Sequence, residues 1–268
     1  MQEAIILGIV QGITEWLPIS SSGMLLLVQS NFFGNTSSFS ESIELFLFLH
    51  LGTFFAALIY FWNEVIRLAK VAIRYTASPQ PSKLLLKFMV LTTLLSGIVG
   101  FILLYIISSF EAQYSISAQL INIIIGVLLL ITAFLQLSKK NHSNGHRDIA
   151  DLNKEDALFL GFLQGFSAIP GISRSGITVP GLLFRNFSSE ISLKLSFLMS
   201  LPIILGGNII LGTHEIAFSA EHTLGLVFSF VFGIATIHFL MKFAQKVNFG
   251  YFLLVFGILL IIASFVSV

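Results

Sequence analysis

Long apolar stretches make up most of this chain, and short polar segments interrupt them. Six of the stretches reach roughly 20 residues, the length that an α-helix needs to cross the hydrocarbon core of a bilayer. They lie at 45–63, 88–110, 116–137, 195–213, 223–241 and 249–268. The pattern therefore predicts an all-α polytopic membrane protein with six transmembrane helices.

Two further apolar segments, 4–33 and 157–186, have a different pattern. Each has a short helical stretch, then a polar turn rich in Gly, Pro and Ser, then a second short apolar stretch. Such lengths are too short for a span and favour a re-entrant helical hairpin. Irregular backbone at membrane depth is tolerated only where protein buries it or where it lines a wet cavity. We therefore expect the turns at 18–23 and 171–176 to line a site.

The two hairpin segments are copies of each other. Ala4–Gly23 (AIILGIVQGITEWLPISSSG) aligns without a gap to Ala157–Gly176 (ALFLGFLQGFSAIPGISRSG), with nine identical positions at a constant offset of 153. Three predicted spans separate the copies, and an odd number of crossings inverts the second copy. The chain is thus predicted to be one membrane domain of two inverted-topology repeats, 1–137 and 156–268, joined by a polar cytoplasmic linker at 138–155. Inverted repeats with broken helices are a known way to build a site near the bilayer midplane.

Composition and charge agree with this topology. Hydrophobic residues make up 56% of 268 positions and charged residues 10%, far from the balance of a soluble domain. In the six-span topology, thirteen of the fourteen Lys and Arg residues fall on one side, and the remaining one is Arg174. Because cytoplasmic loops are rich in Lys and Arg, we expect these loops to face the cytoplasm and both termini to lie outside the cell membrane. The absence of cysteine excludes disulfides and thiolate metal sites, and nothing in the sequence indicates a nucleic-acid partner.

Glu15 and Arg174 are the strongest candidates for chemistry, because an ionisable group inside the apolar region is costly and marks function by default. Gln11 lies one helical turn before Glu15, so the two side chains share a face. A carboxylate with an amide oxygen suits a hard divalent cation, Mg²⁺ or Ca²⁺. Glu15 could equally serve as a general base, or form a structural ion pair with Arg174.

Arg174 lies within the second turn, beside several hydroxyl groups. A guanidinium fork matches phosphate oxygens, and hydroxyls and backbone amides at a helix start add further donors. Ser173, Ser175 and Thr178 are therefore candidate phosphate ligands beside Arg174. The alternative is an arginine that merely reaches toward water.

Three consecutive serines occupy the first turn. Ser21, which faces Arg174 in the alignment of the copies, is the candidate nucleophile, since a serine beside a base can be activated. Ser20 and Ser22 are repeated in the second copy and are expected to cap helices. They could also contact phosphate. His50, in the first span, is a candidate accessory residue, although a lone histidine is more often simply packed.

The segments Gln11–Gly23 (QGITEWLPISSSG) and Pro170–Thr178 (PGISRSGIT) resemble the two motifs of the undecaprenyl-diphosphate phosphatase family, which is also known for bacitracin resistance. The resemblance covers essentially the whole chain. It implies a membrane-bound homodimer that removes the terminal phosphate of a C55-type polyprenyl diphosphate at the outer face. The product would be the carrier monophosphate used for cell-envelope glycan synthesis.

The family resemblance also implies a divalent cation and assigns roles by position. Glu15 would be the essential acidic residue with Gln11 as its partner, Ser21 the nucleophile candidate, and the phosphate ligands would be Ser173, Arg174 and Thr178. One position departs from the family, which often has histidine directly after the serine-rich turn, where this chain has Met24. Either Ser21 or a metal-held water attacks, or His50 substitutes, or activity is reduced. A transporter of polyprenyl phosphate that uses the same site is the alternative function.

Overall fold

The computed structural model describes residues 1–33, 39–110, 146–169, 172–211, 219–244 and 249–266, with single positions between 123 and 137. In these ranges the chain forms helices joined by turns, with one isolated β-bridge between Arg147 and Phe187. The longer helices are α3 (Phe39–Tyr60), α5 (Gln80–Phe110), α9 (Ser189–Leu211), α10 (Ala220–Ala244) and α11 (Phe249–Val266). The shorter ones are α1 (Gln2–Thr14), α2 (Ser21–Phe33), α4 (Trp62–Ile73), α7 (Lys154–Gly165) and α8 (Arg174–Phe184).

Long apolar helices lie at several of the predicted spans, and the described residues show three or four crossings rather than all six. Three segments, Gln80–Ile106, Ser189–Ile210 and Ala220–Phe243, are long and apolar enough to cross a membrane, and a fourth crossing is reached if the bent pair α3–α4 counts as one. The chain is thus a helical membrane protein, as its composition indicates. Helix α11 covers the last predicted span. Most of 116–137 lies outside the described residues.

The apolar pattern predicts no helix between the first two spans, at 64–87, but the structure has α4 there. The structure forms a twelve-residue helix there, whose axis is bent by 79° from that of α3. Val65 and Leu68 pack against the core, while Arg67 and Lys70 on the other side are exposed. This two-sided periodicity is the signal of an amphipathic helix, which a search for uninterrupted apolar runs does not detect.

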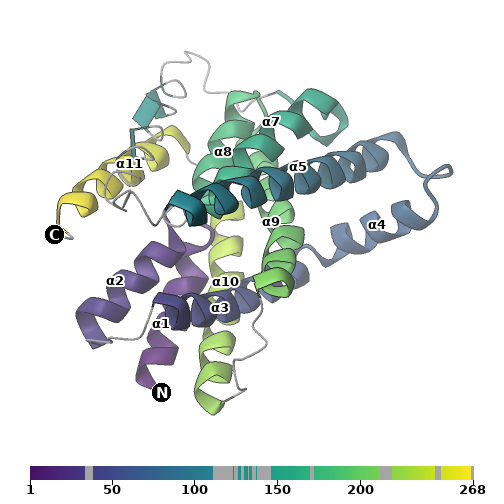
Figure 1. Ribbon diagram of the computed structural model, residues 1–268. Coiled ribbons are helices and arrows are strands. Elements are labelled where there is room, and N and C mark those ends of the chain that lie inside the picture. The colour runs from purple at the N-terminus through teal and green to yellow at the C-terminus, as the bar shows by residue number, and fades with distance from the viewer. Residues whose placement is uncertain are drawn as a thin grey trace.

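The two repeated segments both fold as helix pairs. The first hairpin, α1–α2, rises from the N-terminus at the lower edge of Figure 1, and the second, α7–α8, lies in the upper half. A short turn at 15–20 joins α1 to α2, and a 3₁₀ turn (Phe166–Ala168) follows α7. The starts of α7 and α8 are capped by the side chains of Asn153 and Ser173. The turns of the two hairpins meet in the interior.

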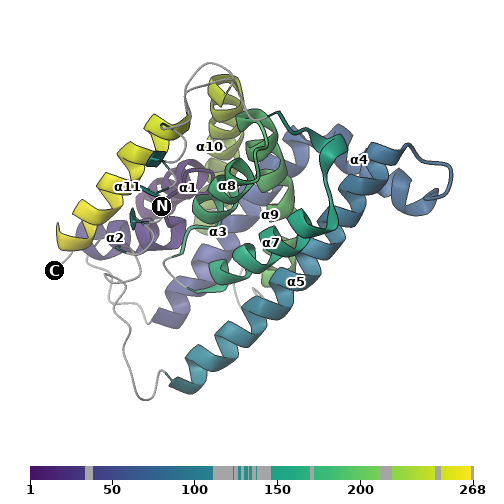
Figure 2. The same cartoon turned by 90° about the horizontal axis from the view of Figure 1, so that it is seen from above.

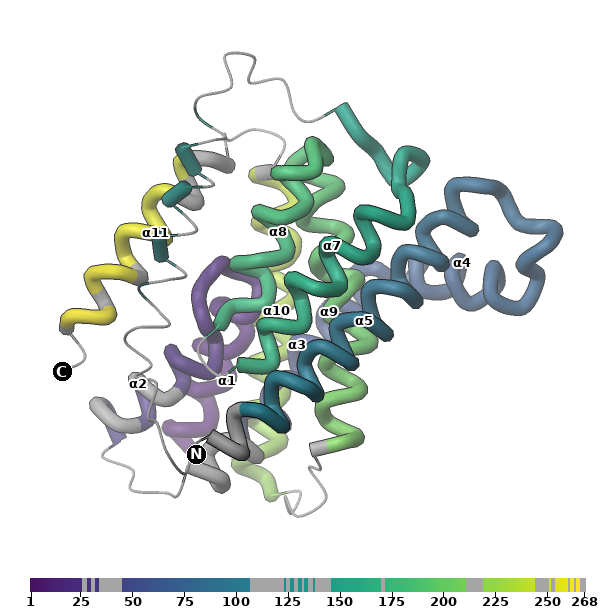
Figure 3. Tube along the Cα trace, turned by 45° about the horizontal axis from the view of Figure 1, so that its top comes forward, coloured from purple at the N-terminus to yellow at the C-terminus, as the bar shows by residue number. Residues whose placement is uncertain are grey.

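Each hairpin packs against a long helix from the other half of the chain. Helix α1 lies along α10, and α7 lies along α5, as Figures 2 and 3 show from two directions. Glycine allows both approaches: a Cβ at Gly12 would come within 2.7 Å of the Ser229 carbonyl oxygen on α10, and one at Gly165 within 2.5 Å of the Val99 Cβ on α5. Small residues let membrane helices approach closely in this way. The two halves of the chain are therefore joined through the packing of their hairpins.

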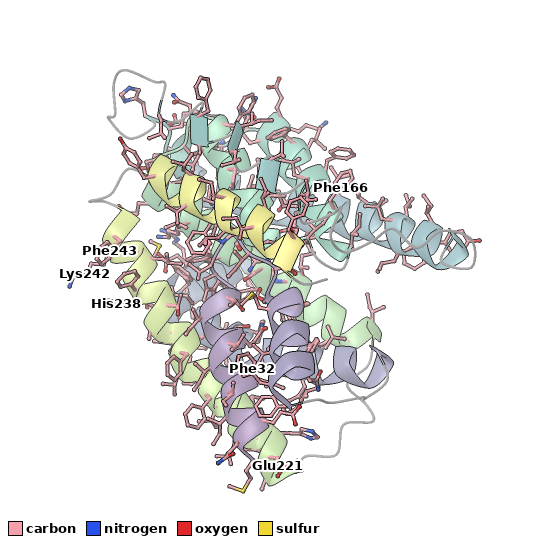
Figure 4. All side chains as sticks on the ribbon, turned by 90° about the vertical axis from the view of Figure 1, so that its left-hand side faces the viewer. Phe32, Phe166, Glu221, His238, Lys242 and Phe243 are labelled. Carbon is pink, nitrogen blue, oxygen red and sulfur yellow. The ribbon has the colours of Figure 1, made fainter. Side chains whose placement is uncertain are left out.

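Charged groups are separated along α10. Figure 4 shows Glu221 near its start and Lys242 near its end, with His238 and Phe243 beside the lysine. Glu221 forms an ion pair with the N-terminal ammonium of Met1 at 2.7 Å. The apolar length between these two ends is what allows α10 to cross a bilayer.

The described end of the linker, 146–155, is folded against the second hairpin. The carboxylate of Asp156 is fully buried and accepts hydrogen bonds from Arg147 Nη1 at 3.0 Å and from Arg185 Nε at 2.6 Å. Asn186 has a positive φ of 68°, which asparagine tolerates better than most residues, and its carbonyl accepts from the Arg147 amide at 3.2 Å. We call Arg147, Asp156 and Arg185 the basal clasp of the second hairpin.

Candidate active site

The turns of the two hairpins are bonded directly to each other. The Ser175 hydroxyl donates to the Leu17 carbonyl at 2.6 Å, and the Ser173 hydroxyl lies 3.4 Å from the same oxygen. Both serines are buried. Residues 156 and 158 positions apart are thus held in contact, which is the meeting of turns that the repeat predicts. Pro170 and Gly171, also part of the second motif, lie outside the described residues.

Glu15 lies at the centre of this junction, where α1 ends. Its side chain is buried, and both of its oxygens are surrounded by donors. Gln11 Nε2 donates to Oε2 at 3.1 Å, and Ser21 Oγ donates to the same oxygen at 3.0 Å. Arg174 Nη2 donates to Oε1 at 3.0 Å. The spacing of Gln11 and Glu15 by four residues puts them on one helix face, as expected.

Arg174 begins α8 and reaches across to the first hairpin. Besides Glu15, it donates through Nη1 to the Ser196 carbonyl at 2.8 Å, and its guanidinium lies 5.8 Å from the centre of the Trp16 ring. Trp16 is itself fixed by an edge-on contact with Phe197 at 4.9 Å. Five N–H groups are available on a guanidinium, and the remaining ones have no partner among the described residues. They can bind an incoming anion.

The serines of the two turns have different roles. Ser20 accepts from the Gly23 amide at 3.2 Å, and Ser173 accepts from the Gly176 amide at 3.0 Å, so both cap a helix start. Ser22 is half-buried at the start of α2. Ser21 alone among the first three serines donates to a carboxylate, that of Glu15. The geometry therefore separates the candidate nucleophile from the caps.

His50 on α3 also reaches Glu15. Its Nε2 lies 3.2 Å from Glu15 Oε2, and its Nδ1 lies 2.6 Å from the Phe46 carbonyl oxygen. The carbonyl requires a proton on Nδ1, which orients the ring with Nε2 toward the site. From the sequence alone His50 is only a candidate accessory residue, because it is far along the chain from Glu15. Met24 is half-buried in the first turn of α2.

Helix α9 contributes to the site in a way that the motifs did not indicate. Thr178 donates to the Arg174 carbonyl at 2.8 Å and shares a hydrogen bond with the Ser196 hydroxyl at 2.7 Å. The candidate phosphate ligand Thr178 is thus bonded to Ser196 in this structure. Ser192, Ser196 and Ser200 are all fully buried at a spacing of four in an apolar helix. That spacing is a sequence signal for a polar face against neighbouring helices.

The residues present fit a cation only in part. Among the described residues no three His, Cys, Asp or Glu side chains are grouped closely enough to hold a metal ion. Several buried side-chain acceptors lack a partner within the described part of the chain, however, and one of them, Gln11 Oε1, lies beside Glu15. A carboxylate and a free amide oxygen are ligands that hard divalent cations accept, with water or phosphate oxygens completing the shell.

The arrangement combines the parts that a phosphoryl transfer needs. A hydroxyl donates to a buried carboxylate, and a guanidinium with free N–H groups lies on the other side of that carboxylate. Such an environment can accept a proton from a nucleophile and stabilise charge that grows on phosphate oxygens.

Comparison with known proteins gives a family for these motifs. Residues 4–263 match the family model described as bacitracin resistance protein BacA. A protein of Methanococcoides burtonii named undecaprenyl-diphosphatase is 41% identical, over 99% of this chain and 98% of its own length. A protein of the same name from Saccharolobus solfataricus is 35% identical, over 98% of this chain and 95% of its own. A third, from Methanococcus maripaludis, is 36% identical over 98% and 97%.

Proposed function

The chain belongs to the family of the bacitracin resistance protein BacA, and on that premise we propose that it is an undecaprenyl-diphosphatase. It removes the terminal phosphate of a C55-type polyprenyl diphosphate and releases the carrier monophosphate for cell-envelope glycan synthesis. The observation that carries this proposal is the contact of Glu15 with both Ser21 and Arg174. A base, a nucleophile and an anion-binding group meet there in one buried place.

In the proposed reaction Ser21 Oγ attacks the terminal phosphorus in line with the bridging oxygen. Its proton passes to Glu15 Oε2, to which the hydroxyl already donates. The bond between phosphorus and the bridging oxygen breaks, and polyprenyl monophosphate leaves. Water then hydrolyses the phosphoserine and returns the enzyme. A water molecule in place of Ser21 would use the same base, and the absence of a phosphoserine would distinguish this route.

Arg174 has a second task in this scheme. Charge grows on the equatorial oxygens of the transferred phosphoryl group, and a preorganised guanidinium stabilises it without reorganisation. The bond to Ser196 and the stacking on Trp16 hold the guanidinium in place before substrate arrives. The hydroxyls of Ser20, Ser22, Ser173, Ser175 and Thr178 are candidate further ligands of the phosphate, and those of Ser173, Ser175 and Thr178 would have to exchange their present hydrogen bonds for it.

A divalent cation, Mg²⁺ or Ca²⁺, is part of the proposal. Glu15 and the unpartnered Oε1 of Gln11 would hold it, together with oxygens of the substrate. This role of Glu15 is the alternative to taking the proton of Ser21. Bound there, it would neutralise phosphate charge.

We further propose the topology that the charges favour. The two hairpins are re-entrant, six helices span the membrane, and the second repeat is inverted relative to the first. Both termini lie outside, the basic loops lie in the cytoplasm and the site opens to the outer face of the cell membrane. A homodimer stays a prediction from the family.

The orientation can be tested by labelling with an impermeant maleimide. Because the chain has no cysteine, the variants Ser78→Cys and Ser219→Cys each place a single cysteine in a loop. On intact cells we expect labelling of Ser219→Cys and none of Ser78→Cys.

Phosphate release from C55 diphosphate by the detergent-purified protein tests the function. We expect release in the presence of Mg²⁺ or Ca²⁺ and its loss in Glu15→Gln and Arg174→Gln, with the exposed Lys242→Gln as matched control. Unchanged release in both site variants would remove the basis of the proposal. Movement of polyprenyl phosphate across vesicles without hydrolysis would favour the transporter instead.

A further inference from the structure

Helix α4 and the turn that leads into α5 enclose a basic cavity that the proposed reaction does not use. The cavity has a volume of about 560 Å³. Figures 1 and 3 show α4 and the start of α5 projecting from the rest of the molecule, away from the hairpin turns. The residues that line the cavity include Trp62, Ile66, Arg67, Lys70, Arg74 and Ser82.

The three cations of this cavity are not neutralised by the protein. Arg67, Lys70 and Arg74 are exposed, and none has a side-chain partner within the described residues. No carboxylate is among the residues that line the cavity. The acidic residue of α4, Glu64, faces the other way and binds Lys194 Nζ at 2.5 Å. The cavity therefore has a net positive charge that only an outside anion can balance.

Apolar groups flank these cations on α4. Trp62 is 52% exposed at the break between α3 and α4, and Ile73 is 83% exposed at the other end of the helix. Tryptophan is enriched where a membrane meets water. Because α3 is one of the apolar helices, a helix bent by 79° from it runs closer to the membrane plane than across it. A basic, amphipathic helix in that position is typical of an interfacial helix.

We propose that α4 lies in the membrane interface and that its cavity binds the phosphate of an anionic phospholipid headgroup. Arg67, Lys70 and Arg74 contact the phosphate, while Trp62 and Ile73 enter the acyl boundary beside it. A ligand with a phosphate and an apolar chain fits this pairing of cations with exposed apolar side chains, whereas inorganic phosphate satisfies only the cations. Arginine in particular offers a rigid fork to phosphate oxygens.

Quenching of Trp62 fluorescence tests the site directly. The chain has two tryptophans, and Trp16 is buried, so the signal of a Trp62→Phe variant gives the background. The full chain is placed in vesicles that contain brominated phosphatidylglycerol with plain phosphatidylcholine, and then in vesicles with the bromine on the other lipid. The ratio of the two quenching constants measures the preference for the anionic lipid.

We expect a clear preference for phosphatidylglycerol in the wild type and its fall by on the order of tenfold in Lys70→Gln/Arg74→Gln. The matched control, Lys154→Gln/Lys242→Gln, removes the same charge from exposed positions elsewhere and keeps the preference. Thermal unfolding checks that the variants fold. Should the site variant not fold, added salt must reduce the wild-type preference, because exposed charges are screened.

Three results would overturn the proposal. Equal quenching by both lipids would show that the cavity selects no anion. A preference that survives Lys70→Gln/Arg74→Gln in folded protein, or that salt leaves unchanged, would place the selectivity elsewhere. Removal of the preference by inorganic phosphate alone would show that the cavity takes free phosphate rather than a lipid headgroup. None of these results depends on hydrolysis at Glu15.

Discussion

The two hairpins share one backbone arrangement, a pair of short helices joined by a turn, but differ in the side chains of their turns. Gln11 and Gln164 occupy equivalent positions, yet Gln11 donates to Glu15 in its own hairpin, whereas Gln164 donates to the Ser96 hydroxyl on α5 at 3.1 Å. The cause is the residue one turn later, which is Glu15 in the first copy and Ala168 in the second. A single carboxylate thus turns a packing amide into part of a site.

The bases of the hairpins differ in the same manner. Glu3 and Asp156 are equivalent by the offset of the repeat. Glu3 accepts from Gln29 Nε2 at 3.2 Å, while Asp156 is held by two arginines in the basal clasp. The base of the second hairpin thus carries a buried carboxylate with two arginine partners, whereas the equivalent carboxylate of the first hairpin is only half-buried.

The largest effect is expected at the two charged residues of the turns. Glu15→Gln and Arg174→Gln should each lower kcat about 10³-fold, since each removes a group that acts at the reacting phosphate. The double variant should lose little more than either single one, because residues that act as a unit are not additive. Steady-state phosphate release from C55 diphosphate measures all three. Fully multiplicative losses would contradict the idea that the hairpins form one site.

The basal clasp should contribute more to stability than its counterpart in the first hairpin. Asp156→Asn leaves two arginines without their carboxylate and should lower the free energy of unfolding by about 2 kcal/mol. Glu3→Gln, at a half-buried position, should cost about 0.5 kcal/mol. Thermal unfolding of the detergent-purified variants gives the comparison. Equal losses would mean that the two bases are equivalent after all.

The repeated glutamines separate catalysis from packing. Gln11→Leu should lower kcat/KM about tenfold, because it removes the donor to Glu15 and the unpartnered amide oxygen together. Gln164→Leu should leave kcat/KM near the wild-type value and change mainly the melting temperature, through loss of the bond to Ser96. Phosphate release with varied Mg²⁺ is the readout for both. A tenfold loss in Gln164→Leu would show that the second copy also takes part in the reaction.

The smallest effect is a dependence of stability on pH. Burial alone would raise the pKa of Asp156, but hydrogen bonds from Arg147 and Arg185 outweigh it, and the pKa of the carboxyl lies below its usual range. The clasp is therefore fully formed above the unfolded pKa of about 3.9 and is lost as the pH falls through the lower folded value. The free energy of unfolding, measured from neutral to acid pH, should show a decrease that Asp156→Asn lacks. An identical decrease in that variant would show that other carboxyl groups cause it.

Much of the fold could be predicted from the sequence, because the length of the apolar runs indicates the long helices and the repeat indicates the two hairpins. Helices α3, α5, α9 and α10 lie where runs of apolar residues are long, and the gapless repeat indicates that Glu15 and Arg174 belong to equivalent turns. Helix α4 was missed, since amphipathic periodicity rather than hydropathy defines it. The contacts of His50 and Ser196 could not be predicted, because they depend on how α3 and α9 pack around the turns.

The packing of each hairpin against a helix from the other half of the chain has a consequence for its synthesis. Helix α1 finds its packing surface on α10, more than 200 positions later in the chain, so the ribosome must complete most of the protein before the first hairpin can dock. Helix α7, by contrast, finds α5 already synthesised. The second hairpin can therefore pack as soon as it is synthesised. The first hairpin is synthesised first but is among the last elements to pack.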